Sequence, residues 1–457
     1  MADERVVIVG AGPAGCRAAE ALAAAGLRPT VIDEARAAGG QIYRRPPPGF
    51  TRSAETLYGP DAGKAKAVHA GFDALAGRID HRPGTTVWGL SGNRLFLRCG
   101  DEAEILPFDR LVLATGAVDR VMPVPGWTRP GVFTLGAAQI ALKAQGVSIG
   151  APVVFLGSGP LLLLVAHQYA KAGAEVAAVL DTSRLSDQIA ALPLLAARPA
   201  FLARGIALRL GLRRLGVAVH QGVRPEEILG DDNGVVAIGW RGADGSARRL
   251  EARAVALGWH LRSETQLAQL AGCRMSFDPV WRQWAPTIDP MGRSSRPDVY
   301  LAGDGTRILG ADGAEAAGRL AAAALLADIG RPIDDDRFRP LLRRRRRLDR
   351  FSRGLARAFP WPAEACRDRP DDAILCRCEA VTVGEYRASL QRTGAAEINR
   401  AKAFSRVGMG RCQGRYCGAA AAELLAGETG DVSAAGRLRP QSPVKPLPAS
   451  AAEIGGR

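Results

Sequence analysis

The stretch that decides the fold is VVIVGAGPAGCRAAEALAAAGLRPTVIDE, residues 6–34. Four apolar residues precede Gly10, an alanine-rich segment follows Gly15, and a second apolar run ends at Asp33. This pattern predicts a strand, a tight glycine turn, a helix and a second strand. In such a unit the first glycine permits the turn, Gly12 leaves space for a pyrophosphate, and Gly15 lets the helix pack closely against the strand. The phosphates then face the free N–H groups at the amino end of the helix.

A dinucleotide site of this kind also needs an acidic residue about twenty positions after the turn, which binds the ribose hydroxyls. Asp33 fits the ungapped spacing and Glu34 directly follows it, so both are candidates. The first unit therefore predicts a dinucleotide site that contains Gly10, Gly12, Pro13, Ala14, Gly15, Asp33 and Glu34.

A second unit of the same kind, APVVFLGSGPLLLLVAHQYAKAGAEVAAVLDTS, spans residues 151–183. It contains Gly157 and Gly159, but Leu162 stands where the third glycine is expected. The leucine compromises the contact between helix and strand, and Asp181 is the acidic residue placed for a ribose. We expect a Rossmann-like domain here, with NAD(P) binding and a role as scaffold as the two alternatives.

Composition limits the classes of function. The chain has 457 residues, which suggests about three domains. Its formal net charge is +15, but the arginines are spread along the chain and only Arg343–Arg347 forms a dense basic run, so we expect no nucleic-acid partner. No apolar run has the length of a membrane helix, and the first residues leave no room for a signal peptide. The sequence thus predicts a cytoplasmic protein without a membrane span.

Four of the eight cysteines are clustered late in the chain. Cys376 and Cys378 belong to CRCEAVTVGEY, and Cys412 and Cys417 belong to GRCQGRYCG. Four thiolates form the ligand set of a 2Fe-2S cluster or of tetrahedral zinc. Structural zinc usually takes wider pairs than Cys-x-Cys, and Cys417 stands at the expected start of a helix, whose dipole stabilises anionic sulfur. The spacing favours the 2Fe-2S cluster, with zinc and unliganded thiols as alternatives.

Two further segments resemble flavoproteins of the glutathione and thioredoxin reductase superfamily. FDRLVLATG and DVYLAGDG each end an apolar strand, the first at Thr115 and Gly116 and the second at Gly303 and Asp304. The resemblance implies that FAD occupies the first site, that Asp304 binds its ribitol, and that the next helix points its amino end at the isoalloxazine. The further contacts that it implies are Gly40, Gln41, Val87, Thr115, Gly116 and Gly303.

The superfamily's disulfide reductases carry a redox cysteine pair in one of these domains. Here GGQIYRR, residues 39–45, contains no cysteine, and residues 156–275 contain only Cys273. We therefore expect no disulfide exchange.

The late cysteine segments, CRCEAVTVGEY and KAFSRVGMGRCQGRYCG, resemble the ferredoxin-like module of bacterioferritin-associated ferredoxin, except that the second pair is Cys-x4-Cys rather than Cys-x2-Cys. This departure, together with GGQIYRR, VPGWTRPGVFTLGAAQ and GWHLRSETQLAQLAGC, resembles the large flavoprotein subunit of opine oxidase, hydrogen cyanide synthase and dye-linked proline or hydroxyproline dehydrogenases. The resemblance covers about residues 1–425 and implies that the four clustered cysteines bind a 2Fe-2S cluster.

The resemblance also implies partners. In these relatives a separate flavoprotein subunit similar to D-amino-acid oxidase oxidises the amine, so a β subunit of that kind is expected. Further candidates are a small ferredoxin-like subunit, which would be an additional partner, and a peripheral link to the respiratory chain. More distant relatives imply FMN at a subunit interface, and NAD or ATP as alternatives to FAD in the first site.

We therefore expect an α/β protein with two dinucleotide-binding, Rossmann-like domains of the glutathione and thioredoxin reductase type and a small iron-sulfur domain. The expected boundaries are 1–122 and 288–330 for the FAD-binding domain, 123–287 for the inserted NAD(P)-binding-like domain, 331–370 for an arginine-rich connector, 371–425 for the 2Fe-2S domain, and 426–457 for a tail that is extended, or mobile unless a partner holds it.

The function that follows is the electron-transferring α subunit of a heteromeric, flavin-dependent dehydrogenase for an opine, D-hydroxyproline, proline or glycine. The alternatives are a stand-alone NAD(P)H-dependent reductase and a structural scaffold subunit. No set of His, Tyr or Arg side chains for an amino-acid carboxylate is recognisable in the sequence, so the catalytic residues stay open. We expect that the chain alone does not oxidise an amino acid.

Overall fold

The first of two parallel sheets is built around the opening glycine turn. In the computed structural model, which describes residues 4–331, 338–429 and 431–448, its strand order is β20-β7-β1-β2-β3 and every neighbouring pair is parallel. The strands are β1 (Val6–Val9), β2 (Thr30–Asp33), β3 (Asp80–Pro83), β7 (Arg110–Leu113) and β20 (Val299–Leu301).

Alternate residues of β1 face different layers, so the sheet is covered on both sides. Val6 and Ile8 pack with α1 (Pro13–Ala24), α3 (Ala62–Asp73) and α10 (Gly310–Asp328). Val7 and Val9 pack with the three-stranded antiparallel sheet on the other face. The remaining elements of this part are α2 (Ala54–Tyr58), β4 (Thr85–Ser91), β5 (Arg94–Cys99) and β6 (Glu102–Pro107). Burial on both faces explains why β1 is apolar at every position.

The second parallel sheet has the order β12-β11-β10-β16-β9. Its strands are β9 (Val132–Thr134), β10 (Val153–Ser158), β11 (Val176–Asp181), β12 (Ala218–Gln221) and β16 (Ala254–Trp259), and its helices are α4 (Leu135–Ile140), α5 (Pro160–Lys171), α6 (Leu185–Ala190), α7 (Leu192–Leu195) and α8 (Pro199–Arg214). An antiparallel sheet of β13 (Arg224–Asp231), β14 (Gly234–Arg241) and β15 (Ala247–Glu251) flanks it. The two parallel sheets confirm the predicted α/β class with tandem Rossmann-like domains.

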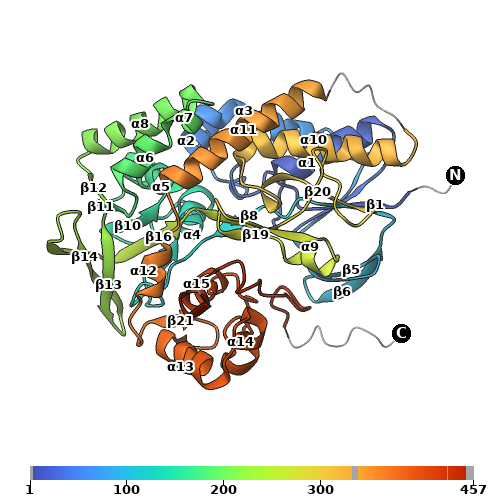
Figure 1. The fold of residues 1–457 in the computed structure, drawn as a ribbon. Coiled ribbons are helices and arrows are strands. Elements are labelled where there is room, and N and C mark those ends of the chain that lie inside the picture. Colours follow the sequence, from blue (N-terminus) through green and yellow to red (C-terminus); the bar gives the residue numbers. More distant parts are fainter. Residues whose placement is uncertain (1–3, 332–337, 430, 449–457) are drawn as a thin grey trace.

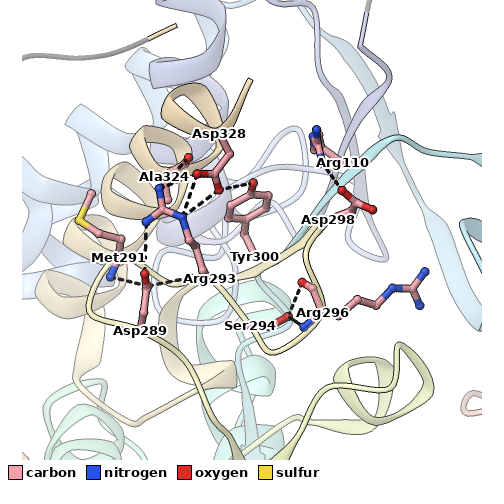
Figure 2. A network of polar contacts seen from close by, with 10 residues as sticks. All are labelled: Arg110, Asp289, Met291, Arg293, Ser294, Arg296, Asp298, Tyr300, Ala324 and Asp328. Carbon is pink, nitrogen blue, oxygen red and sulfur yellow. Dashed lines mark hydrogen bonds and ion pairs between the residues drawn. The ribbon is translucent and has the colours of Figure 1, made fainter. Parts of the chain in front are cut away.

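A short antiparallel ribbon joins the two halves. It consists of β8 (Ala117–Asp119) and β17 (Leu261–Ser263), and it leads into α9 (Gln266–Leu270) and the hairpin of β18 (Met275–Asp278) and β19 (Gln283–Pro286). The chain then returns to the first sheet through β20, and Figure 2 shows the polar network that fixes this return. Arg293 contacts Asp289 at 3.2 Å and Asp328 of α10 at 2.8 Å, and the Tyr300 hydroxyl donates to Asp328 at 2.7 Å.

The predicted arginine-rich connector contains a long helix, α11 (Arg339–Ala358), followed by α12 (Ala363–Arg367). The basic run lies on α11, where Arg344 contacts Asp312 at 3.2 Å. Figure 1 shows the cluster module below the second sheet. Its elements are β21 (Ile374–Cys376), β22 (Val381–Thr382), α13 (Val383–Thr393), α14 (Ile398–Ser405) and α15 (Gly418–Thr429). One continuous core joins this module to the second domain, and the Trp127 indole N–H donates to the Ile374 carbonyl at 2.6 Å.

The expected tail is held by the chain itself. Helix α15 continues to Thr429, past the expected boundary at 425, and residues 431–448 then run without helix or strand. The Val444 side chain is 1% exposed, and its N–H donates to the Trp88 carbonyl at 2.8 Å. Residues 431–448 are thus extended, and contacts within the chain itself hold them. No helix among the described residues is long and apolar enough to span a membrane.

Candidate nucleotide and cluster sites

The first glycine turn has the shape that a pyrophosphate needs. A Cβ atom at Gly15 would lie 1.7 Å from the Gly10 carbonyl oxygen, so only glycine allows α1 to pack so closely on β1. At Gly12, which precedes Pro13 at the start of α1, a Cβ atom would meet only the Gly40 Cα, at 3.7 Å. The space in front of the amino end of α1 is thus open, as an anion site requires.

The two candidate acids are separated by the structure. Asp33 lies at the end of β2, and its carboxylate accepts hydrogen bonds from the N–H groups of Ala11 at 2.5 Å and Ala35 at 2.6 Å. Burial raises the pKa of Asp33 despite these two bonds. Glu34 contacts Lys445 of the tail at 2.7 Å. Only Asp33 is directed at the glycine turn.

The predicted residues of the other two strand ends lie beside the turn. A Cβ atom at Gly303, after β20, would meet the Ala14 Cβ at 2.9 Å, and one at Gly305 would meet the Thr115 hydroxyl at 2.8 Å. Asp304 accepts hydrogen bonds from the Leu309 and Gly310 N–H groups, at 2.9 and 3.2 Å, at the start of α10. Burial raises the pKa of Asp304 to about 6.

Of the remaining predicted contacts, some lie beside the first turn and others do not direct a side chain at it. Gly40 adjoins Gly12, as described above, and Gly116 follows Thr115 with a φ of 71°. Gln41 is exposed, and its side-chain oxygen accepts a hydrogen bond from Arg44 at 2.9 Å. The Val87 side chain is buried in the core between the first sheet and β4, so only its backbone is available to a ligand.

The second glycine turn is filled by the protein. A Cβ atom at Gly159 would lie 3.1 Å from the ring of His260, which follows β16. The His260 ring bonds to the carbonyl of Phe359, the residue after α11, at 2.8 Å, and burial lowers the pKa of His260 to about 4. Asp181 has no exposed surface, and it accepts two hydrogen bonds from Ser183, at 2.7 and 3.0 Å.

The four clustered cysteines come together from two segments. The thiols lie close enough to form hydrogen-bonded pairs, Cys376 with Cys417 and Cys378 with Cys412. The bond from Cys417, with three backbone N–H groups, lowers the pKa of Cys376 to about 6, while the pKa of Cys417 is raised well above its ordinary range. Cys417 directly precedes α15, as predicted.

The arrangement fits a two-iron cluster. A 2Fe-2S cluster takes two ligands on each iron, and four thiols that meet as two pairs match this requirement. All eight cysteines are free thiols in the structure.

A buried ion pair connects the first site to the cysteine loop. The Thr115 hydroxyl donates to the Glu264 carbonyl at 2.7 Å, and the Glu264 carboxylate contacts Arg415 at 2.6 Å. Arg415 lies between Cys412 and Cys417, and both charged side chains are about nine-tenths buried, at 10% and 9% exposed. Sequence reasoning missed this pair, although Glu264 lies in the segment GWHLRSETQ that carried part of the family resemblance.

The structure also brings together an arginine set that was not recognisable in the sequence. Arg120, Arg262, Arg282 and Arg437 line one cavity between β17, the β18–β19 hairpin and the cluster module. They are dispersed over more than 300 positions, so no sequence window contains them together.

Comparison with known proteins agrees with this geometry. Residues 4–324 match the pyridine nucleotide-disulphide oxidoreductase family, and residues 374–427 match the BFD-like 2Fe-2S binding domain. The A subunit of opine oxidase from Agrobacterium tumefaciens (strain Ach5) is 38% identical over 97% of this chain and 90% of its own length. Hydrogen cyanide synthase subunit HcnB of Pseudomonas aeruginosa is 34% identical over 98% of both chains.

Solved structures show the same fold. L-proline dehydrogenase from P. horikoshii superposes with a TM-score of 0.68 at 20% identity, covering 98% of this chain and 79% of that one. Thioredoxin reductase of T. acidophilum has a TM-score of 0.52 at 19% identity and covers 72% of this chain and 99% of its own. On the identities to the two named subunits, the chain belongs to the family of hydrogen cyanide synthase subunit HcnB and the A subunit of opine oxidase, within the pyridine nucleotide-disulphide oxidoreductases.

Proposed function

We propose that this chain is the electron-transferring α subunit of a heteromeric, flavin-dependent dehydrogenase that acts on an amine or amino acid. The observation that carries the proposal is the buried Glu264–Arg415 ion pair, which ties the Cys412–Cys417 loop to the strand end at Thr115. A two-electron carrier in the first site and a one-electron carrier between the cysteines would then be neighbours in one rigid frame. The relatives are named as subunits of an opine oxidase and of a hydrogen cyanide synthase, which supports a role within a heteromeric enzyme.

In this proposal the first site holds FAD. Gly12 and the amino end of α1 would face the pyrophosphate, Asp33 would accept hydrogen bonds from the ribose hydroxyls, and Asp304 would accept one from the ribitol. The flavin, when bound, would supply two-electron chemistry and the 2Fe-2S cluster one-electron chemistry. ATP or NAD in this site would keep the fold but not the redox role.

The partner in this proposal is a flavoprotein β subunit that oxidises the substrate, with FMN at the interface between the two subunits. A peripheral respiratory acceptor and a small ferredoxin-like subunit would complete the path. The alternative of a stand-alone NAD(P)H-dependent reductase has less support, because His260 occupies the second turn and Asp181 is fully engaged.

The experiment compares the isolated chain with the chain co-purified with its partner from the native host. Under anaerobic conditions a secondary amine or a D-amino acid is added, and bleaching of the flavin and cluster absorption is followed. We expect bleaching of this chain's cofactors only in the complex, and none on adding NADPH to the isolated chain. Full turnover of an imino acid or opine by the isolated chain would contradict the proposal.

Cysteine variants test the cluster in the same complex. Serine at any of the four clustered positions should remove the visible absorption and most of the iron, since oxygen is a poor substitute for a soft thiolate ligand. The matched control is Cys99→Ser, because Cys99 is an exposed thiol on β5. Unchanged iron content in two of the four variants would refute the ligand assignment.

A further inference from the structure

A polar cavity lies at the junction of the two Rossmann-like halves and the cluster module. Four guanidinium groups line it, those of Arg120, Arg262, Arg282 and Arg437, against one carboxylate, that of Glu423. The Glu423 side chain is 1% exposed and is already bound by Arg282 through two hydrogen bonds, at 2.8 and 2.6 Å. The lining therefore has an excess of positive charge.

The four arginines are not equally engaged. Arg120 donates to the carbonyls of Trp281 and Arg282, at 2.9 and 3.1 Å, and stacks on Trp361. Arg437 donates to the Gln269 side chain at 2.5 Å. The Arg262 side chain makes no hydrogen bond or ion pair within 4 Å with any residue that the structure describes, and its Nε is buried without a partner. One guanidinium in the cavity wall is thus left without an acceptor.

The network in Figure 2 shows, for comparison, how a fully paired arginine of this chain is bound. There Arg293 is bound by two carboxylates, those of Asp289 and Asp328, and by the Ala324 carbonyl at 3.2 Å. The hydrogen bonds to Asp328 hold the pKa of Arg293 above its usual range. Burial and the neighbouring Arg262 and Arg282 instead lower the pKa of Arg120 to about 9. The first cluster is balanced, whereas the second sets four guanidinium groups against the one carboxylate of Glu423.

Unpaired acceptors line the same cavity. The Ser263 and Gln266 side chains are 3% and 5% exposed, and the Ser263 hydroxyl and the Gln266 side-chain oxygen have no partner in the described structure. The Gln413 side-chain oxygen, from the cysteine loop, is likewise buried and unpaired there. Buried polar groups cost free energy unless they are hydrogen-bonded, so these atoms call for a ligand that also donates.

We propose that the junction cavity binds a small carboxylate that carries its own hydrogen-bond donor, an amino acid or a hydroxy acid. The carboxylate would accept from Arg262, whose planar fork matches two oxygens on one carbon. The amino or hydroxyl group would donate to Gln266, Gln413 or Ser263. Phosphate is a poorer match, because at neutral pH it presents mainly acceptors and would leave the glutamine oxygens unpaired.

The cavity lies beside the path between the two sites. Ser263 directly precedes Glu264, whose N–H donates to the Gly116 carbonyl at 3.0 Å, and Gln413 follows Cys412. A ligand there would bridge the ribbon between the halves and the cysteine loop. This inference goes beyond the proposed function and does not require it, because a bound carboxylate would regulate or stabilise the junction whether or not electrons pass between the two sites.

The test is calorimetric titration of the isolated full chain with four probes, L-alanine, L-lactate, propionate and inorganic phosphate. We expect alanine or lactate to bind more tightly than propionate, which lacks the donor, and phosphate not to compete. Arg262→Gln should weaken the binding about tenfold or more, since it removes a charged hydrogen bond. The matched control is Arg213→Gln, an exposed arginine of α8, which should change nothing.

A second variant keeps the proposal testable if Arg262→Gln does not fold. Gln266→Leu should weaken the binding of alanine or lactate and leave the binding of propionate unchanged, while the cluster absorption reports that the module is intact. No heat with any carboxylate, or binding of phosphate alone, would overturn the proposal. So would an Arg262→Gln chain that binds the acids normally and differs only in the reduction potential of its cluster. Oxidation of the bound acid by the isolated chain would support the cavity and refute the proposed function.

Discussion

The two glycine turns of this chain have the same fold and opposite surroundings. In front of Gly12 there is open space, whereas the ring of His260 fills the corresponding space at Gly159. Asp33 is half-buried and directed at its turn, whereas Asp181 is fully buried and bonded to Ser183. The difference teaches that a strand, a glycine turn and a helix specify a domain, and that the residues packed against the turn decide whether a nucleotide reaches it.

The largest expected effect comes from filling the open turn. Gly12→Val should abolish nucleotide retention, because the branched side chain occupies the space of the pyrophosphate. The backbone φ of −74° at Gly12 and the absence of close neighbours in the described structure allow the variant to fold. Mass spectrometry of the heat-released nucleotide measures the loss. Gly159→Ala is the control and should retain the nucleotide while lowering the Tm. Loss of nucleotide in this control would contradict the conclusion that only the first turn is open to a nucleotide.

Two titratable groups, one near each turn, give opposite pH dependences of stability. Asp304 has a folded pKa of about 6 against an ordinary 3.8, so its contribution is present below pH 4 and is lost as the pH rises to about 6. His260 has a folded pKa of about 4 against 6.5, so its contribution is present above pH 6.5 and is lost as the pH falls to about 4. Each is at most about 3 kcal/mol, and together they nearly cancel.

Single variants of the nucleotide-free chain separate these two effects. Relative to the unaltered chain, Asp304→Asn should shift the slope of the free energy of unfolding against pH between about 4 and 6 upward, and His260→Gln should shift it downward. Urea unfolding at a series of pH values is the measurement. Identical slopes in the two variants would show that the groups do not titrate as their burial implies.

The acids after β2 and β11 give a smaller effect. Asp33→Asn should weaken nucleotide binding by about 1.5 to 3 kcal/mol, the range of one hydrogen bond to a charged group. Asp181→Asn should leave nucleotide binding unchanged and instead lower the free energy of unfolding, because Asp181 is bonded within the protein to Ser183 and Arg209. Reversed results, with binding lost only in the Asp181 variant, would place the nucleotide in the second domain.

The smallest effect is expected at the neighbouring acid. Glu34→Gln removes the partly exposed contact with Lys445, and such pairs contribute about 0 to 1 kcal/mol. Nucleotide retention should be unchanged, which would assign the ribose to Asp33 alone. Release of nucleotide from this variant would reinstate Glu34 as a ligand.

Local patterns predicted the parts of the fold that depend on neighbours in sequence. The apolar strands, the glycine turns and the helix start after Cys417 follow from spacing alone, because each is settled by backbone sterics and by hydrogen bonds within a few residues. The tail was predicted less well. Nothing local in residues 431–448 indicates packing, and the burial of Val444 depends on β4, more than 350 positions earlier.

By itself the sequence determined the α/β class, the first glycine turn with its two candidate acids, and the four cysteines with their family. Only the tertiary structure directed Asp33 at the first turn and Glu34 at Lys445, placed His260 beside the second turn, paired Glu264 with Arg415, and brought four dispersed arginines into one cavity. The physical reason is the separation in sequence of the residues that interact. Backbone conformation is set by adjacent residues, whereas burial, ion pairing and access to a site depend on groups that meet only after the three parts of the chain have packed together.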